Sequence, residues 1–183
     1  MQQADLGLIG LAVFEPRAHR DERGFFMESW NRRTFAEFLG GDVEFVQDNH
    51  SRSVQWVLRG LHYQLPPHSQ GKLVRVVRGR VWDVAVDIRR GSPTFRQWAA
   101  MELNEDDPRQ LWVPAGFAHG FLTLSSVADV LYKTTAYYDA ALDRCIRWDD
   151  PDLAIGWPLE GRRPVVSERD ARGGYLADSV VFD

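Results

Sequence analysis

Apolar and polar residues alternate over short stretches along most of the chain, and turn residues separate these stretches. Such alternation predicts β-strands whose two faces differ in polarity. After residue 43 the stretches follow each other at short, regular spacing, with glycine and proline in the connections. The predicted strands are 7–15, 25–30, 43–49, 54–63, 72–77, 81–88, 98–103, 110–113, 121–124 and 130–135. Many short strands with such turns indicate an all-β sandwich or barrel.

One stretch near the N-terminus has the spacing of a helix instead. Phe35, Phe38 and Leu39 fall on one side of a short helix, and Thr34 is a candidate for its N-cap. Two glycines at 40–41 are expected to end it. The charged residues before this helix, from 17 to 24, predict a loop rather than a strand.

The strand predicted at 81–88 separates its side chains by polarity. One face is wholly apolar, whereas the other carries Asp83 and Asp87 between small residues. That polar face fits the lining of a cavity, and it also fits a solvent-exposed face, which is common in antiparallel sheets. On this strand alone, the exposed arrangement is slightly favoured.

Length and composition indicate one globular domain spanning residues 1–183. A chain of 183 residues can bury a substantial core, and the segment from about residue 149, rich in proline, glycine and charge, is expected to pack on the barrel. A net charge of −4 disfavours nucleic acid and anionic membranes as partners. No apolar stretch is long enough to span a bilayer.

The cellular compartment is suggested by two further features. Residues 1–10 lack the basic and apolar regions of a signal peptide. The single cysteine, Cys145, excludes an internal disulfide and fits a reducing environment. Both features lead us to expect a cytoplasmic protein.

Residues 59–64, with the sequence RGLHYQ, place several polar side chains on a predicted strand. Burying polar groups costs free energy unless they have partners, so this cluster indicates a functional site. The ordinary pKa of an imidazole is about 6.5, so a histidine such as His62 can serve as a general base once a carboxylate orients it. The candidate carboxylates are Asp83, Asp87 and Asp170.

Gly60 lies between two of these polar residues. Strict alternation places Arg59 and His62 on opposite faces of the strand. If both face one pocket, the strand has to bulge or bend, and a glycine tolerates that conformation. We therefore expect a bulge at Gly60.

Five motifs follow one another in a specific order, although each of them is weak alone. They are residues 47–49 (QDN), 59–64 (RGLHYQ), 83–89 (DVAVDIR), 114–121 (PAGFAHGF) and 131–135 (LYKTT). Together they closely resemble the dTDP-4-dehydrorhamnose 3,5-epimerase family, over about residues 7–170. The resemblance implies a cupin-type jelly-roll β-barrel with one or two short helices, usually a homodimer. It also implies catalysis without a metal or an organic cofactor.

The implied activity is that of an isomerase. Members epimerise C3 and C5 of dTDP-4-dehydro-6-deoxy-D-glucose to give dTDP-4-dehydro-L-rhamnose, by acid and base proton transfer through an enolate. His62 resembles the base, Asp170 its partner, Tyr132 the acid and Lys72 the lysine near the ketone oxygen. The positions that resemble nucleotide-sugar contacts are Arg23, Glu28, Gln47, Asp48, Asn49, Arg59, His119, Tyr138, Asp143 and Arg169, with Tyr138 as the ring that stacks on thymine. Asp143 and Arg169 depart from the commonest pattern, which has glutamate and lysine there.

Three other hypotheses remain open from the sequence. A narrower epimerase would act at C3 alone or at C5 alone. A metal-dependent cupin would use His62, His68 and His119 as ligands, although the chain lacks the pair of histidines, one residue apart and followed by glutamate, that is usual in such barrels. A non-catalytic barrel would bind the nucleotide sugar without exchanging its protons.

Overall fold

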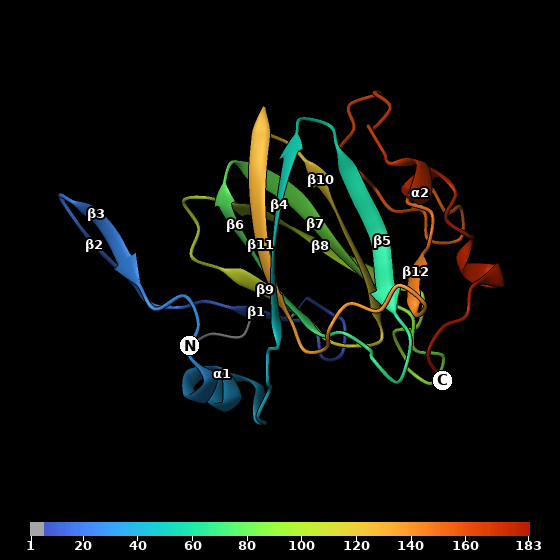
Figure 1. Cartoon of the computed structure of the whole chain (residues 1–183). Helices are drawn as coiled ribbons and strands as arrows, with labels where there is room; N and C mark the ends of the chain where they lie inside the picture. The colour runs from blue at the N-terminus through green and yellow to red at the C-terminus, as the bar shows by residue number, and fades with distance from the viewer. Residues whose placement is uncertain (1–5) are drawn as a thin grey trace.

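Two antiparallel five-stranded sheets face each other in this computed structural model, which describes residues 6–183 (Figure 1). The first sheet has the order β1-β9-β6-β11-β4 and the second the order β12-β5-β10-β7-β8. The strands are β1 Ala12–Phe14, β2 Ala18–Asp21, β3 Gly24–Met27, β4 Gln47–Val54, β5 Leu58–Gln64, β6 Lys72–Arg78, β7 Arg80–Asp87, β8 Trp98–Asn104, β9 Gln110–Val113, β10 Phe117–Thr123, β11 Val127–Thr134 and β12 Asp143–Cys145. The predicted all-β jelly-roll class is confirmed, with the barrel flattened into two sheets.

The helices of the described part are short, as expected. They are α1 Arg32–Leu39, α2 Glu168–Ala171 and the 3-10 helix η1 Leu176–Asp178. Asn31 caps α1 by accepting hydrogen bonds from the backbone N–H groups of Arg33 and Thr34, so the prediction of Thr34 as the cap was wrong. The physical reason is that Asn31 has extended backbone and a side chain that reaches the free N–H groups, whereas Thr34 already lies inside the helix. Gly40, with φ of 73°, ends the helix as predicted.

The interior of the sandwich is apolar over most of its length. Val74 on β6, Val81 and Ala85 on β7, and Val130 on β11 belong to one buried cluster between the sheets. Alternate residues of β7, among them Val84, pack outward against a second buried cluster that includes residues of the C-terminal segment. Both faces of the second sheet are therefore covered.

The packing of the two sheets against each other corrects one prediction. Asp83 and Asp87 are fully buried, so the solvent-exposed interpretation of their face was wrong. Asp87 accepts hydrogen bonds from the side chains of Arg89, Ser92 and Thr94. The sequence of β7 alone cannot reveal this, because residues of the opposite sheet cover this face.

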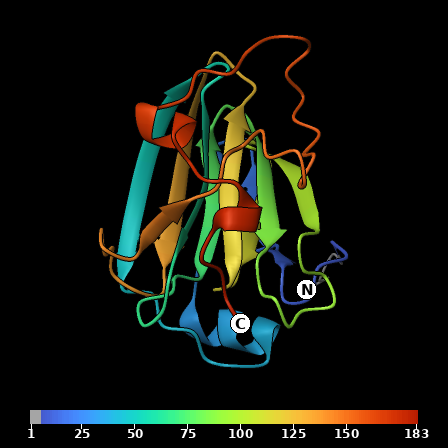
Figure 2. The ribbon, with the colours of Figure 1, turned by 90° about the vertical axis from the view of Figure 1, so that its right-hand side faces the viewer.

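The C-terminal segment crosses the outer face of the second sheet (Figure 2). Isolated parallel bridges join Val57 to Val165, Ile146 to Gly174 and Arg89 to Phe182. The hydroxyl of Tyr63 donates a hydrogen bond to the carbonyl of Val180 at 2.7 Å. This path brings α2 against β5, the strand that carries His62.

The N-terminal segment differs from its prediction. Residues 17–24 form most of a hairpin, in which β2 pairs with β3, instead of a loop. Both strands of this hairpin are largely exposed. Their charged residues therefore form no apolar face that would predict a strand from the sequence. The hairpin projects from the body of the molecule (Figure 1), and Phe26 on β3 is 73% exposed.

Other predicted strands are present with shifted bounds. The prediction at 43–49 corresponds to β4, which begins at Gln47, and that at 121–124 corresponds to β10, which begins at Phe117. No helix in residues 6–183 is long and apolar enough to cross a membrane. Residues 1–5, part of the stretch examined for a signal peptide, lie outside the described residues.

Candidate active site

A bulge in β5 sets the direction of His62. His62 pairs with His119 of β10 and Arg59 pairs with Phe121, so two residues of β5 lie opposite one residue of β10. Gly60 has φ of 123°, and a Cβ there would lie 2.6 Å from the Cα of Gly120. The bulge expected at Gly60 is present, and only glycine fits it.

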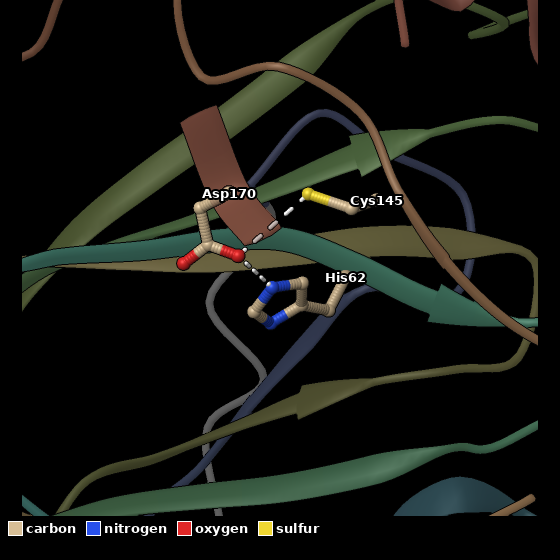
Figure 3. A group of neighbouring side chains, drawn as sticks. All are labelled: His62, Cys145 and Asp170. Atoms are coloured by element: carbon tan, nitrogen blue, oxygen red, sulfur yellow. Dashed lines mark hydrogen bonds and ion pairs between the residues drawn. The ribbon is translucent and has the colours of Figure 1, made fainter. Parts of the chain in front are cut away.

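His62 meets a carboxylate from the C-terminal segment. Its Nε2 lies 2.6 Å from Oδ1 of Asp170, which is 108 residues away in sequence and lies on α2 (Figure 3). Ser167 caps this helix by accepting a hydrogen bond from the backbone N–H of Asp170 at 3.1 Å. Of the three candidate carboxylates, Asp170 is the one that contacts His62, because Asp83 bonds His119 and Asp87 bonds Arg89.

Asp170 is ionised in this setting. Burial opposes ionisation of its carboxyl, but hydrogen bonds with His62, Ser167 and the backbone of Gly60 outweigh burial and lower its pKa. A carboxylate next to Nε2 favours the tautomer with the proton on Nε2. The other ring nitrogen, Nδ1, points away from Asp170 and is then free to accept a proton (Figure 3).

Lys72 lies at the start of β6, close to the backbone of the same histidine. Its ammonium donates a hydrogen bond to the carbonyl of His62 at 3.2 Å. The side chain is buried, and burial lowers its pKa from the ordinary 10.5 to about 8, while the charges of Asp143 and Asp83 partly oppose that change. The lysine is therefore a cation at neutral pH, and its pKa of about 8 lies close to that pH.

Tyr132 comes from the other sheet. It lies on β11, paired with Asn49 of β4 and Val74 of β6, and packs against the apolar cluster between the sheets. Burial, with a smaller contribution from the charge of Asp143, raises the pKa of its phenol, and the charge of Arg59 partly opposes this. The phenol thus keeps its proton at neutral pH and can donate it.

A second histidine–carboxylate pair lies beside the first. Nε2 of His119 on β10 is 2.8 Å from Oδ1 of Asp83 on β7, and both side chains are buried. Because His119 and His62 are paired residues on adjacent strands, the two imidazoles form one wall of the site.

Polar groups converge at the rim of the site. The Tyr138 hydroxyl donates to Asp143 at 3.1 Å, and Arg169 pairs with the same carboxylate at 2.5 Å. Gln47 accepts from the backbone N–H of Tyr138 and donates to Asn49. Five residues predicted as nucleotide-sugar contacts are thereby connected, and the Tyr138 ring stays 56% exposed.

Comparison with known proteins shows the family of the chain. A family model described as dTDP-4-dehydrorhamnose 3,5-epimerase matches residues 5–178. The chain belongs to the dTDP-4-dehydrorhamnose 3,5-epimerase family. This confirms the family that the five sequence motifs indicate.

Individual relatives of this epimerase family match nearly the whole chain. A dTDP-4-dehydrorhamnose 3,5-epimerase of Pseudomonas aeruginosa is 53% identical over 182 residues, covering 100% of this chain and 99% of the relative. A dTDP-6-deoxy-D-glucose-3,5-epimerase of Legionella pneumophila, solved with dTDP-4-keto-L-rhamnose, has a TM-score of 0.93 and 48% identity, covering 98% of this chain and 94% of that one. A 3′-monoepimerase of Streptomyces bikiniensis, solved with dTDP-quinovose, has a TM-score of 0.87 and 35% identity, covering 94% and 86%.

Three of the residues that resemble family contacts do not join the site within one chain. Arg23 lies in the turn of the projecting hairpin, where it bonds Asp21. Glu28 follows the same hairpin. Asp48 points to the side of β4 opposite Gln47 and Asn49, because side chains alternate along a strand, and it pairs with Lys133 at 2.9 Å.

The three histidines of the metal-dependent hypothesis do not form one group of possible metal ligands in the described residues, although His62 and His119 are neighbours. His68 bonds Asp139 at 3.0 Å, and His119 is engaged with Asp83. The one group of three possible metal ligands found in residues 6–183 is His62, Cys145 and Asp170. Sequence reasoning missed Cys145 as a neighbour of His62, since only the pairing of β12 with β5 brings the two together.

Proposed function

We propose that the protein epimerises dTDP-4-dehydro-6-deoxy-D-glucose at C3 and C5, giving dTDP-4-dehydro-L-rhamnose. The observation that supports this most directly is the contact of His62 with the ionised Asp170, at 2.6 Å, on the sheet opposite Tyr132. A base on one side of a pocket and a protonated phenol on the other meet the demand of an inversion at carbon.

Each residue has one role in the proposed mechanism. The C4 ketone acidifies the protons on C3 and C5, because the carbanion delocalises onto oxygen as an enolate. Nδ1 of His62 removes the proton, and Asp170 stabilises the imidazolium that forms. Lys72 supplies a cation for the enolate oxygen. Tyr132 returns a proton to the opposite face, which inverts that centre, and the sequence repeats at the other carbon.

This chemistry uses only proton transfer and charge stabilisation. A carbon acid next to a ketone needs a base, an acid and a donor for the oxygen, and the chain has all three. We therefore propose catalysis without a metal or an organic cofactor. The proposed location is the cytoplasm, where a free thiol such as Cys145 stays reduced.

The rim residues are proposed to hold the nucleotide. Arg59 and Arg169 present planar guanidinium groups, which suit diphosphate oxygens. The exposed ring of Tyr138 offers a surface for the thymine. Gln47 and Asn49 offer amides to the edge of the base or sugar, and His119 lines the wall next to His62.

We propose a homodimer as the active form. Phe25 and Phe26 on the hairpin are 51% and 73% exposed, and exposed aromatic side chains of this kind suit a contact with another copy of the chain. A cavity on the outer face of the first sheet, lined by Trp30, Leu73 and Leu131 among others, offers a surface for such residues. In a dimer of this kind, Arg23 and Glu28 would contact the substrate of the other copy.

The test of the proposed function is proton exchange. Incubation of the keto-sugar with the protein in heavy water should place deuterium at both C3 and C5. Exchange at one carbon alone would assign the narrower epimerase activity. Binding of dTDP without any exchange would leave a non-catalytic barrel as the correct interpretation.

A further inference from the structure

A thiol that the proposed mechanism does not use lies beside the proposed base. Sγ of Cys145 is 3.8 Å from Oδ1 of Asp170 and 3.6 Å from the carbonyl of Ile146, both of them long contacts for hydrogen bonds. Figure 3 shows the thiol and the imidazole approaching the same carboxylate oxygen. The three groups come from β12, β5 and α2, so the fold itself assembles them.

These three side chains offer the ligand atoms that zinc binds. Their nitrogen, sulfur and oxygen atoms all lie within 4.8 Å of one another. Zinc with bonds of about 2.0–2.3 Å keeps tetrahedral ligand atoms roughly 3.3–3.8 Å apart. The contact of His62 with Asp170 would lengthen, while the 3.8 Å contact of Cys145 with Asp170 already fits. Water would take the fourth position, as in zinc sites with three protein ligands.

We propose that His62, Cys145 and Asp170 form a binding site for Zn²⁺, and that zinc bound there inhibits the enzyme. The inhibitory part rests on the proposed function, in which His62 is the base. The metal site itself rests only on the geometry of the three side chains.

Inhibition follows from where the protons go. When zinc binds, the thiol proton of Cys145 is released to solvent and Nε2 of His62 coordinates the ion. The proton that Nε2 carried moves to Nδ1, the atom that has to accept a proton from the substrate. Asp170 becomes a zinc ligand and no longer stabilises an imidazolium. The base is thereby blocked without any change in oxidation state.

The charges around the site determine how strongly zinc competes with the proton of the Cys145 thiol. Burial, followed by the charge of Asp170, raises the pKa of the Cys145 thiol to about 12, while Arg169 partly opposes that rise. The thiol is therefore protonated in the free protein, and the ion has to compete with that proton. Once bound, a thiolate and a carboxylate neutralise the two charges of zinc.

The experiment uses Co²⁺ as a spectroscopic probe of the full-length protein, without substrate. Coordination by Cys145 predicts a thiolate-to-cobalt charge-transfer band in the near ultraviolet, displaced by Zn²⁺. Cys145→Ser should lose this band, keep the uninhibited epimerisation rate, and weaken inhibition by zinc about tenfold or more. His68→Gln, which alters an exposed histidine with its own aspartate, is the control and should leave the band and the inhibition unchanged.

The outcomes separate this proposal from the proposed function. Absence of the cobalt band, or equal zinc inhibition of the original protein and Cys145→Ser, would overturn the zinc site. A Cys145-dependent band in a protein that lacks epimerase activity would support the metal site and overturn the proposed function instead. Cys145→Ala provides a second thiol-free variant if the serine variant folds poorly.

Discussion

At the scale of single residues, four side chains carry the proposed chemistry, and the pKa of the buried lysine predicts an effect on stability. Lys72 keeps a charge in a site that lowers its pKa from 10.5 to about 8. A tenfold difference in proton affinity between the folded and unfolded states corresponds to about 1.36 kcal/mol. Below pH 8 the ammonium of Lys72 is protonated in both states, but the unfolded state binds this proton more tightly than the folded state does. The lysine therefore destabilises the fold at neutral pH.

Lys72→Met should consequently separate stability from activity. We expect the variant to be about 1–3 kcal/mol more stable than the original protein at pH 7. The gain should shrink as pH rises from about 8 to 10.5, because the original lysine then loses its proton in the folded state. Denaturant titrations at several pH values measure this, with Lys133→Met, which alters the only other lysine, as the control. Equal stability of Lys72→Met and the original protein at pH 7 would contradict the account.

The same substitution should slow catalysis. Loss of a donor to a developing oxyanion typically costs about 2.7–4 kcal/mol, or roughly 10²–10³ in kcat. The alkaline limb of the pH profile of kcat/KM, expected near pH 8 from the pKa of Lys72, should also disappear. Steady-state kinetics over pH checks both effects, and an unchanged alkaline limb in Lys72→Met would contradict the role.

The partner of the base gives a second prediction at this scale. Asp170→Asn keeps the size of the side chain but removes the charge that stabilises the imidazolium of His62. We expect kcat to fall by about 10²–10⁴ while dTDP binding persists. Asp178→Asn, which changes an exposed carboxylate in the same segment, is the matched control. Similar losses in both variants would indicate a general effect on the C-terminal segment instead.

At the scale of elements, the bulge of β5 and the capped helix α2 place the base and its partner. A methyl group at position 60 would meet the backbone of Gly120 at 2.6 Å, and φ of 123° disfavours any residue with a Cβ. Gly60→Ala should therefore lower both the melting temperature and kcat. Gly91→Ala, where a Cβ meets nothing within 4 Å, serves as its control. A Gly60→Ala variant with full activity would show that the bulge does not position His62.

Sequence reasoning succeeded for elements whose pattern is local. The bulge follows from the alternation of β5, and the end of α1 follows from Gly40. The hairpin of β2 and β3 was missed because its exposed strands lack an apolar face. The proximity of Cys145 was missed because it depends on strand pairing, which the order of residues does not encode by itself.

At the scale of the whole molecule, packing between segments that are distant in sequence determines which side chains are buried. Asp83 and Asp87 are buried because they share the face of β7 that lies against the first sheet, whereas the C-terminal segment covers the other face, which carries Val84. The pairing of His62 with Asp170 came from the family resemblance, since no local pattern links residues 108 positions apart. The roles of all the predicted site residues stay predictions, and Arg23, Glu28 and Asp48 additionally lie outside the site of their own chain.

The proposed dimer is testable through its hairpin. Phe26→Glu places a charge on an exposed aromatic surface and should convert a dimer into a monomer. Light scattering after size-exclusion chromatography measures the mass, and the epimerisation rate should fall with dissociation. Val180→Glu, which places the same charge on another exposed apolar residue, in the C-terminal segment, is the control. A monomeric original protein with full activity would contradict the proposal.

The central claim is that His62 removes protons from both C3 and C5 of the keto-sugar. Proton NMR of dTDP-4-dehydro-6-deoxy-D-glucose in heavy water, read separately at the two carbons, tests it most directly. The account predicts that deuterium enters both positions with the original protein, and enters neither with His62→Asn, which still binds dTDP. Persistent exchange at both carbons in His62→Asn would contradict the assignment of His62 as the base.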